Sequence, residues 1–167
     1  DCMLVKTFGG AVIGVDAITI TVEVNVDRGM KFFMVGLPDN AVKESQQRIE
    51  AALKNVGYKM PGKKTVVNMA PADIRKEGSS YDLTIAIGIL AASGQIKEDK
   101  IADFMIMGEL SLDGSLQPIK GALPIAIQAR KNGLKGFILP KENAKEAAVV
   151  DDLLVYGVDS IKEVIDF

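Results

Sequence analysis

The sequence predicts an α/β sandwich, in which strands come first and helices then alternate with strands. Apolar and polar residues alternate from residue 18 to residue 26, a pattern typical of a strand with one buried face. Residues 83–92 are apolar on nearly every side, which indicates a central, buried helix. After this helix, short apolar runs alternate with helical patterns up to the C terminus, as in domains that layer helices on a sheet.

The elements before the central helix follow from local patterns. Gly57 is expected to end the first helix, because glycine readily adopts the left-handed conformation found at helix ends. In chain order we expect an edge strand or hairpin over 6–15 with its bend at Gly9-Gly10, the strand 18–26, a turn at 27–29, a returning strand over 31–35, a helix from Asp39 or Asn40 to about 56, and a strand over 65–69.

The elements from the central helix onward are shorter. They are expected to form one domain over residues 3–167, and Asp1-Cys2 is interpreted as a cloning remnant that precedes a native start at Met3. In chain order we expect the helix 83–92, a strand over 104–108, a strand over 110–116 bent by Asp113-Gly114, a helix over 121–131, a strand over 136–139, a helix over 141–149, a strand over 153–156 and a last helix over 160–167.

Composition excludes several classes of function. The net charge is −2, so the chain as a whole lacks the strongly basic character of nucleic-acid-binding domains, although a local basic patch stays open. The absence of histidine excludes a Ser-His-Asp triad and histidine metal ligands within the chain. The carboxylates show no metal-ligand spacing, and Cys2 is the only cysteine. No signal peptide or membrane span is evident, so we expect a cytoplasmic protein.

Residues 57–64 nearly spell a phosphate-binding loop. That motif requires Ser or Thr after its lysine, a strand before it and a helix after it. Here Lys64 takes the Ser/Thr position, Pro61 removes one amide donor, and the predicted order is helix before and strand after. We therefore expect no nucleotide and no other cofactor in this chain.

Five basic residues flank the predicted strand 65–69. One interpretation is a pair of solvated loops, and the other is a basic rim that contacts DNA phosphates without reading sequence. The candidate DNA-binding residues are Lys59, Lys63, Lys64, Arg75 and Lys76.

Three segments, in this order, make the chain resemble the N-terminal domain of the ComM/YifB family of magnesium-chelatase-like AAA+ ATPases. They are Met-Val-Gly-Leu-Pro-Asp at 34–39, the stretch from Val-Asn-Met-Ala-Pro-Ala-Asp at 67–73 into residues 76–83, and Met-Gly-Glu-Leu-Ser-Leu-Asp-Gly at 107–114 leading into Pro118. The resemblance covers essentially all of residues 3–167. It implies the fold of Lon proteolytic domains, shared with the Lon-like domain of RadA and with a ribosomal small-subunit protein.

The resemblance also implies what the parent protein does. Family members are ATP-driven hexameric rings, in ComM a DNA branch-migration helicase that acts in natural transformation. ATP and Mg²⁺ would belong to an ATPase module that follows this domain. The implied partners are that module, neighbouring subunits and, as a candidate, DNA. Nothing in the sequence supports porphyrin metallation.

Residues 76–84 are similar to the segment around the catalytic serine of Lon-type proteases, with Ser80 at the serine position. Alignment through Pro118-Ile119 puts Leu123 at the position of the Lon lysine, and leucine cannot take a proton from serine. Lys120 lies one helical turn earlier. Two hypotheses remain: a non-catalytic domain for oligomerisation or DNA engagement, which Leu123 favours, and a remnant Ser-dependent peptidase. In the first, Ser79 and Ser80 are expected to cap the buried helix.

Overall fold

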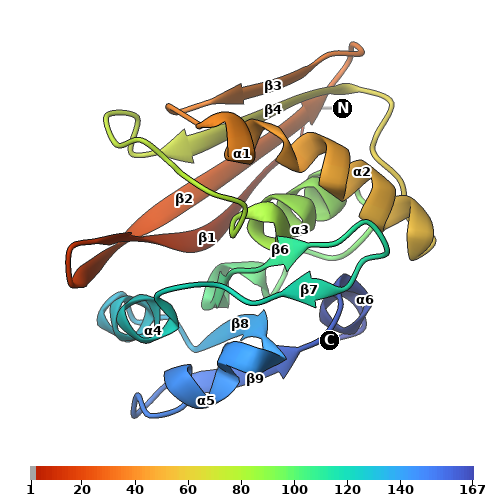
Figure 1. Cartoon of the computed structure of the whole chain (residues 1–167). Coiled ribbons are helices and arrows are strands. Elements are labelled where there is room, and N and C mark those ends of the chain that lie inside the picture. The colour runs from red at the N-terminus through yellow and green to blue at the C-terminus, as the bar shows by residue number, and fades with distance from the viewer. Residues whose placement is uncertain (1–2) are drawn as a thin grey trace.

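The computed structural model describes residues 3–167, so the interpretation of Asp1-Cys2 lies outside the described part (Figure 1). The architecture is mixed α/β. One seven-stranded sheet has the order β3-β4-β2-β1-β5-β8-β9, and β6 and β7 form a small second sheet. Only the two pairings made by β2 are antiparallel; the other four within the large sheet are parallel.

The elements have the following bounds. The strands are β1 (Met3–Ile13), β2 (Asp16–Asp27), β3 (Phe32–Val35), β4 (Lys64–Ala70), β5 (Phe104–Ile106), β6 (Glu109–Leu110), β7 (Leu116–Gln117), β8 (Gly136–Pro140) and β9 (Leu154–Val158). The α-helices are α1 (Asn40–Lys43), α2 (Ser45–Asn55), α3 (Asp82–Ala92), α4 (Ala122–Lys131), α5 (Ala144–Ala147) and α6 (Ile161–Ile165), with short 3-10 helices over Ile101–Asp103 and Lys141–Asn143.

Strand β1 corrects the first expectation. It is one unbroken strand between β2 and β5, neither bent at Gly9-Gly10 nor at an edge of the sheet. The two glycines are needed for packing instead. A Cβ on Gly9 would lie 2.9 Å from Met107 Sδ, and a Cβ on Gly10 would lie 2.9 Å from Ile125 Cγ2. The bend lies at Gly14, where φ is +66° and the chain reverses into β2.

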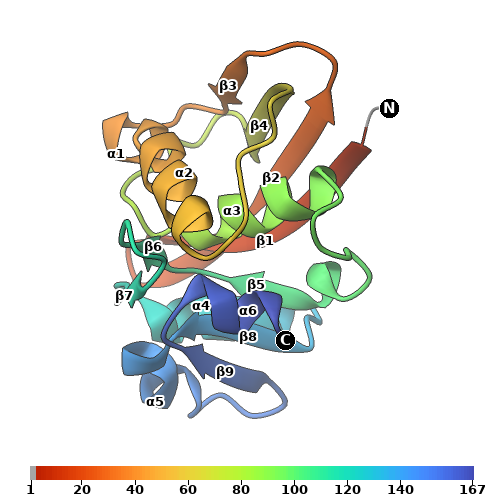
Figure 2. The same ribbon diagram turned by 90° about the vertical axis from the view of Figure 1, so that its right-hand side faces the viewer.

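Strand β3 corrects the second expectation, because it does not return along β2. It pairs in parallel with β4, and β4 lies between β3 and β2. Strand β4 buries Thr65, Val67 and Met69, whereas every residue of β3 is at least partly exposed. The strand with the more buried side chains therefore takes the inner position. Figure 2 shows β3 and β4 at one end of the sheet and β8 and β9 at the other.

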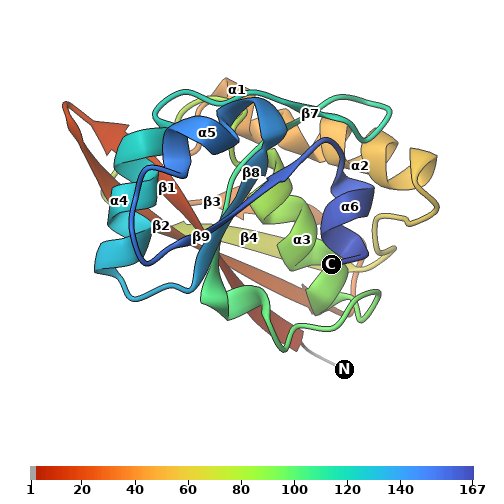
Figure 3. The ribbon, with the colours of Figure 1, turned by 90° about the horizontal axis from the view of Figure 1, so that it is seen from below.

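Helices α3 and α4 cover opposite faces of the sheet. Helix α3 is buried along its whole length, as predicted, and Gly88 lets it approach Val24 of β2. Helix α4 packs Ile125 against Gly10 on the other face of β1. In the view from below, α4 and α6 lie on opposite sides of β9, and α6 is the helix next to the C terminus (Figure 3). Within residues 3–167, no helix is long and apolar enough to cross a membrane.

The remaining elements match their predictions with two exceptions, an interrupted helix and a hairpin in place of a bent strand. The helix after Asp39 is interrupted at Glu44, and Asp39 caps it by accepting a hydrogen bond from the Val42 amide. Gly57 has a φ of +89°, as expected for the end of that helix. The predicted bent strand over 110–116 is wrong: β6 and β7 form a hairpin, in which the Ser111 amide donates to the Ser115 carbonyl across the turn.

Candidate functional site

A groove of about 920 Å³ lies at the start of α3, and we call it the serine groove. Residues 10–13 of β1, residues 74–75 and 77–81 before α3, and residues 118–121 before α4 line it. Met107, Glu109 and Ile125 complete the lining. The groove therefore unites the second and third of the segments that carry the family resemblance.

Ser79 and Ser80 lie in this groove, but the expectation that they cap α3 is wrong. Helix α3 begins at Asp82 without a side-chain cap. Backbone carbonyls satisfy its first amides instead: the Asp82 amide donates to Ser79 and the Leu83 amide donates to Gly108. The Ser79 hydroxyl donates to Glu109. Within the described residues the Ser80 hydroxyl has no hydrogen-bond partner, so it is free to meet a ligand.

The lysine position of a Lon-type dyad contributes nothing to the groove. Leu123 lies in the first turn of α4 and is absent from the groove lining, and its amide donates to Glu146. Lys120 does line the groove, but its side chain is exposed. In the described part of the chain neither residue hydrogen-bonds Ser80. The pair needed for nucleophilic attack by serine is therefore not assembled.

Lys76 cannot take the DNA-binding role predicted for it, because its side chain is fully buried. Its Nζ donates to the carbonyls of Gly36, at 2.7 Å, and Pro71. Desolvation lowers the pKa of Lys76, although Asp73 favours the charged form. The sequence around Lys76 is charged and therefore suggests a solvated side chain. Its burial relies on these carbonyl acceptors, and that of Gly36 lies 40 residues away in the chain.

Lys76 belongs to a set of contacts that join the first two segments of the family resemblance. The Asp39 amide donates to the Lys76 carbonyl, the Lys76 amide donates to Leu37, and the Gly78 amide donates to the Asp39 carboxylate. Gly36 must be glycine, because a Cβ there would lie 2.1 Å from the Met69 carbonyl oxygen. These contacts hold Leu37 53% exposed with a φ of +58°, a costly conformation for leucine.

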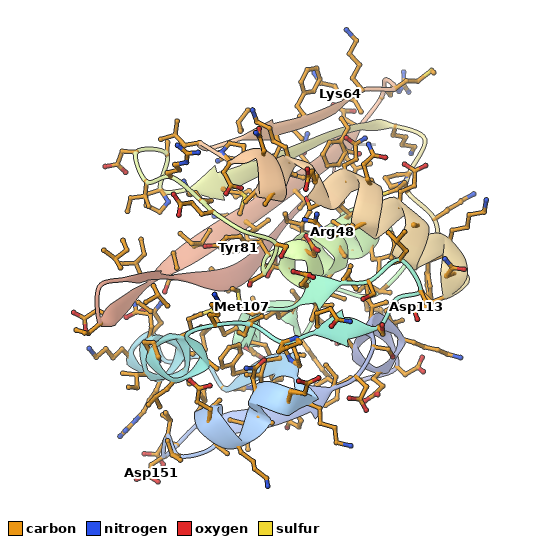
Figure 4. All side chains as sticks on the ribbon, in the orientation of Figure 1. Arg48, Lys64, Tyr81, Met107, Asp113 and Asp151 are labelled. Carbon is orange, nitrogen blue, oxygen red and sulfur yellow. The ribbon has the colours of Figure 1, made fainter. Side chains whose placement is uncertain are left out.

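A partly buried ion pair positions the start of α3, and Figure 4 labels its cation, Arg48. Arg48 of α2 binds Asp82 through two hydrogen bonds of 2.6 and 2.9 Å, and Asp82 also accepts from the Leu110 amide. The hydrogen bond to Asp82 raises the pKa of Arg48, whereas burial raises the pKa of Asp82 despite its donors. This pair was not predicted. It ties α2, α3 and β6 together, which fixes one wall of the serine groove.

The structure regroups the basic residues at one end of the sheet. Lys63 lies just before β4 and Lys64 is its first residue. The turn between β2 and β3 lies against them: the Thr65 amide donates to the Lys31 carbonyl, and Gly29 packs on Lys64. This turn adds Arg28 and Lys31, which the sequence prediction missed. We call Arg28, Lys31, Lys63 and Lys64, all exposed, the basic end. Figure 4 shows Lys64 at the rim of the molecule, far from Tyr81 in the groove.

The other predicted basic residues lie apart from the basic end. Lys59 is exposed on the loop before β4, where its backbone exchanges two hydrogen bonds with the Gln95 side chain. Arg75 is 69% exposed and pairs with Glu77. It follows the opposite end of β4, a strand that spans roughly 20 Å. The five predicted residues therefore do not form one patch.

Two further features bear on nucleotide and metal binding: the loop over residues 57–64 and the placement of possible metal ligands. The loop over residues 57–64 runs from α2 into β4, as predicted, so no helix N terminus follows it to face phosphates. Among the described residues no group of three His, Cys, Asp or Glu side chains is placed to hold a metal ion.

Sequence similarity links the chain to one family of proteins. The family model described as subunit ChlI of Mg-chelatase matches residues 22–143. The chain is 41% identical to competence protein ComM of Haemophilus influenzae over 165 residues, which are 98% of this chain and 32% of that protein. It is 44% identical to YifB of Escherichia coli over 142 residues, 84% of this chain and 28% of that protein.

A more distant similarity is to Lon proteases. The chain is 30% identical to Lon protease 2 of Bacillus subtilis over 125 residues, 74% of this chain and 22% of that protein. This similarity fits a Lon-like fold. The chain spans about a third of the length of its ComM and YifB relatives. On the family model and these relatives, the chain belongs to the ComM/YifB family of magnesium-chelatase-like proteins.

Proposed function

We propose that this chain is a non-catalytic N-terminal domain of a magnesium-chelatase-like AAA+ ATPase, and that it engages DNA for the attached motor. The observation that carries this proposal is the basic end, where Arg28 and Lys31 of the β2–β3 turn lie beside Lys63 and Lys64 at the start of β4. ATP and Mg²⁺ belong to the ATPase module of the full-length protein. That module and neighbouring subunits are the domain's other partners.

The composition of the basic end suits a phosphate backbone. Its cations are exposed, and the carboxylate of Asp27, which lies across from Lys64 in the sheet, already accepts a hydrogen bond from the Arg28 amide. Phe33 is 42% exposed beside them, with Lys64 Nζ 5.7 Å from the centre of its ring. Lysine and arginine bind phosphates without reading sequence, and an exposed aromatic ring can stack on an unpaired base.

The alternative, a remnant Ser-dependent peptidase, rests on Ser80 and its place in the groove. The missing base argues against it, since Leu123 lies outside the groove lining and the Ser80 hydroxyl has no partner among the described residues. We expect no cleavage of casein by the full-length protein with ATP present. Cleavage that Ser80→Ala abolishes would establish the peptidase instead.

The DNA proposal is tested by charge reversal in the full-length protein. One variant changes Arg28, Lys31, Lys63 and Lys64 to Glu. Its matched control changes Lys131, Lys141, Lys145 and Lys162, exposed on or beside α4, α5 and α6, to Glu. Fluorescence anisotropy with labelled single- and double-stranded DNA should show at least about a tenfold loss of affinity in the first variant and little change in the control. An equal loss of DNA affinity in both variants, or no loss in either, would show that the basic end does not bind DNA.

A further inference from the structure

Strand β1 has one edge that is filled along its whole length and one that is not. On the β2 side, pairing runs from Met3 to Ile13. On the other side, β5 pairs with β1 at Phe8 only. Beyond that point the chain after β5 turns away, and the Met107 amide donates to the Ile138 carbonyl of β8. In the described part of the chain, no strand occupies the edge from Gly10 to Ile13.

Backbone groups at this edge point into the serine groove. The Gly10 amide faces away from β2, since it donates to Met107 Sδ at 3.4 Å, a weak acceptor. Backbone direction alternates along an antiparallel pair, so the Val12 amide and carbonyl face the same way as those of Gly10. Ala11 and Ile13 instead bond to β2. The open edge therefore offers the Val12 N–H and the carbonyls of Gly10 and Val12.

The groove encloses this edge on both faces of the sheet. On one face lie Ile125 and Gly121. Position 121 requires glycine, because a Cβ on Gly121 would lie 2.4 Å from Val12 Cγ2. On the other face lie Tyr81 and Met107. The result is a slot with a strand edge at its base. The rim mixes cations with the carboxylates of Glu77 and Glu109, so it does not select for an anion such as DNA.

We propose that the serine groove binds an extended segment of another polypeptide, which adds to β1 as a strand and is not cleaved. An extended peptide carries alternating donors and acceptors that can pair with the unpaired backbone groups of this edge. Strand addition of this kind supplies affinity through main-chain hydrogen bonds. Apolar side chains of the segment would contact Ile13, Ile74 and Ile125. This site is separate from the basic end and independent of DNA binding.

The probe is a fluorescein-labelled octapeptide of alternating valine and threonine with a lysine at each end. Its control is the same peptide with its four central amides N-methylated. The methyl groups remove the N–H donors from both edges of the peptide and block close approach to a strand. Anisotropy with the described chain should show saturable binding of the first peptide, with a dissociation constant below about 1 mM. The methylated peptide should bind at least about tenfold more weakly, the effect of losing one or more hydrogen bonds.

Two variants at one position test the site itself. Val12→Pro removes the amide that faces the groove and leaves the bonds to β2 in place, so affinity for the unmethylated octapeptide should fall about tenfold. Val12→Ala keeps the amide and should bind within about threefold of the unaltered chain. Bound peptide should also slow hydrogen exchange of the Val12 amide. Absence of binding, equal binding of both peptides, or unchanged exchange at Val12 would each overturn the proposal, whatever the fold of Val12→Pro.

Discussion

At the residue scale, the burial of Lys76 is the least expected feature, because lysine side chains usually lie in solvent. Its ammonium group is buried against the carbonyls of Gly36 and Pro71, next to the exposed Arg75. Lys76→Met leaves both carbonyls without this donor and should lower the free energy of unfolding by about 2 kcal/mol. Arg75→Met, the neighbouring control, should change it by less than about 0.5 kcal/mol. Urea unfolding measures both. Equal effects would mean that the buried hydrogen bonds of Lys76 contribute nothing.

Tyr81, in the wall of the groove, supplies a pH test of the same region. Burial raises the pKa of Tyr81 to about 12, with smaller contributions from Asp39 and Glu77. The unfolded chain loses this proton first, near pH 10. Stability from the protonated phenol is therefore complete below about pH 10 and is lost as pH rises through about 12.

Comparison with Tyr81→Phe isolates this effect from the titration of the lysines. Between about pH 9 and about pH 11, the unaltered chain should lose about 1 kcal/mol more than Tyr81→Phe. Urea midpoints at both pH values give the difference. Parallel losses in the two proteins would show that the phenol titrates as it does in the unfolded chain.

At the element scale, the close crossing of β1 and α4 explains the glycine at position 10. A Cβ on Gly10 would lie 2.9 Å from Ile125 Cγ2, whereas a Cβ on Gly62 meets nothing within 4 Å. Gly10→Ala should cost about 2 kcal/mol through overpacking, and Gly62→Ala should stay within about 0.5 kcal/mol of the unaltered chain. Thermal unfolding of the two variants is the measurement. A harmless Gly10→Ala would imply that α4 does not pack this closely on the strand.

Sequence patterns predicted where helices and strands occur along the chain, but they did not predict which strands lie side by side in the sheet. The alternation in residues 18–26 and the apolar run 83–92 are local, and β2 and α3 formed where they indicated. The place of β3 depends on which distant strand buries more side chains, so the predicted return along β2 was wrong. The site follows the same division. Ser80 was found by motif, whereas Arg28 and Lys31 join Lys64 only through the packing of the β2–β3 turn on β4.

At the scale of the whole molecule, the isolated chain should not bind nucleotide. The glycine- and lysine-rich loop over residues 57–64 leads into a strand, so its amides lack the arrangement that cradles phosphates. Calorimetric titration with Mg-ATP should therefore give only heats of dilution. Saturable binding at micromolar concentration would contradict this account of the loop.

The isolated chain should also bind DNA weakly, because its net charge is −2 and one domain presents one basic end. An oligomer of the full-length protein would present several such ends on one duplex, and linked weak contacts add by raising the effective concentration. We therefore expect weak binding by the chain alone and strong binding by the assembled protein. Similar DNA affinities of the isolated chain and the assembled protein would contradict the idea that several basic ends act together on one duplex.

The measurement that tests the central claim most directly is the salt dependence of DNA binding by the full-length protein. Each lost phosphate contact lowers the slope of log affinity against log salt by about one. Lys63→Gln and Lys64→Gln should each reduce the slope by about that amount per subunit in contact, and Lys131→Gln and Lys145→Gln should leave it unchanged. Unchanged slopes in all four variants would contradict the assignment of DNA engagement to the basic end.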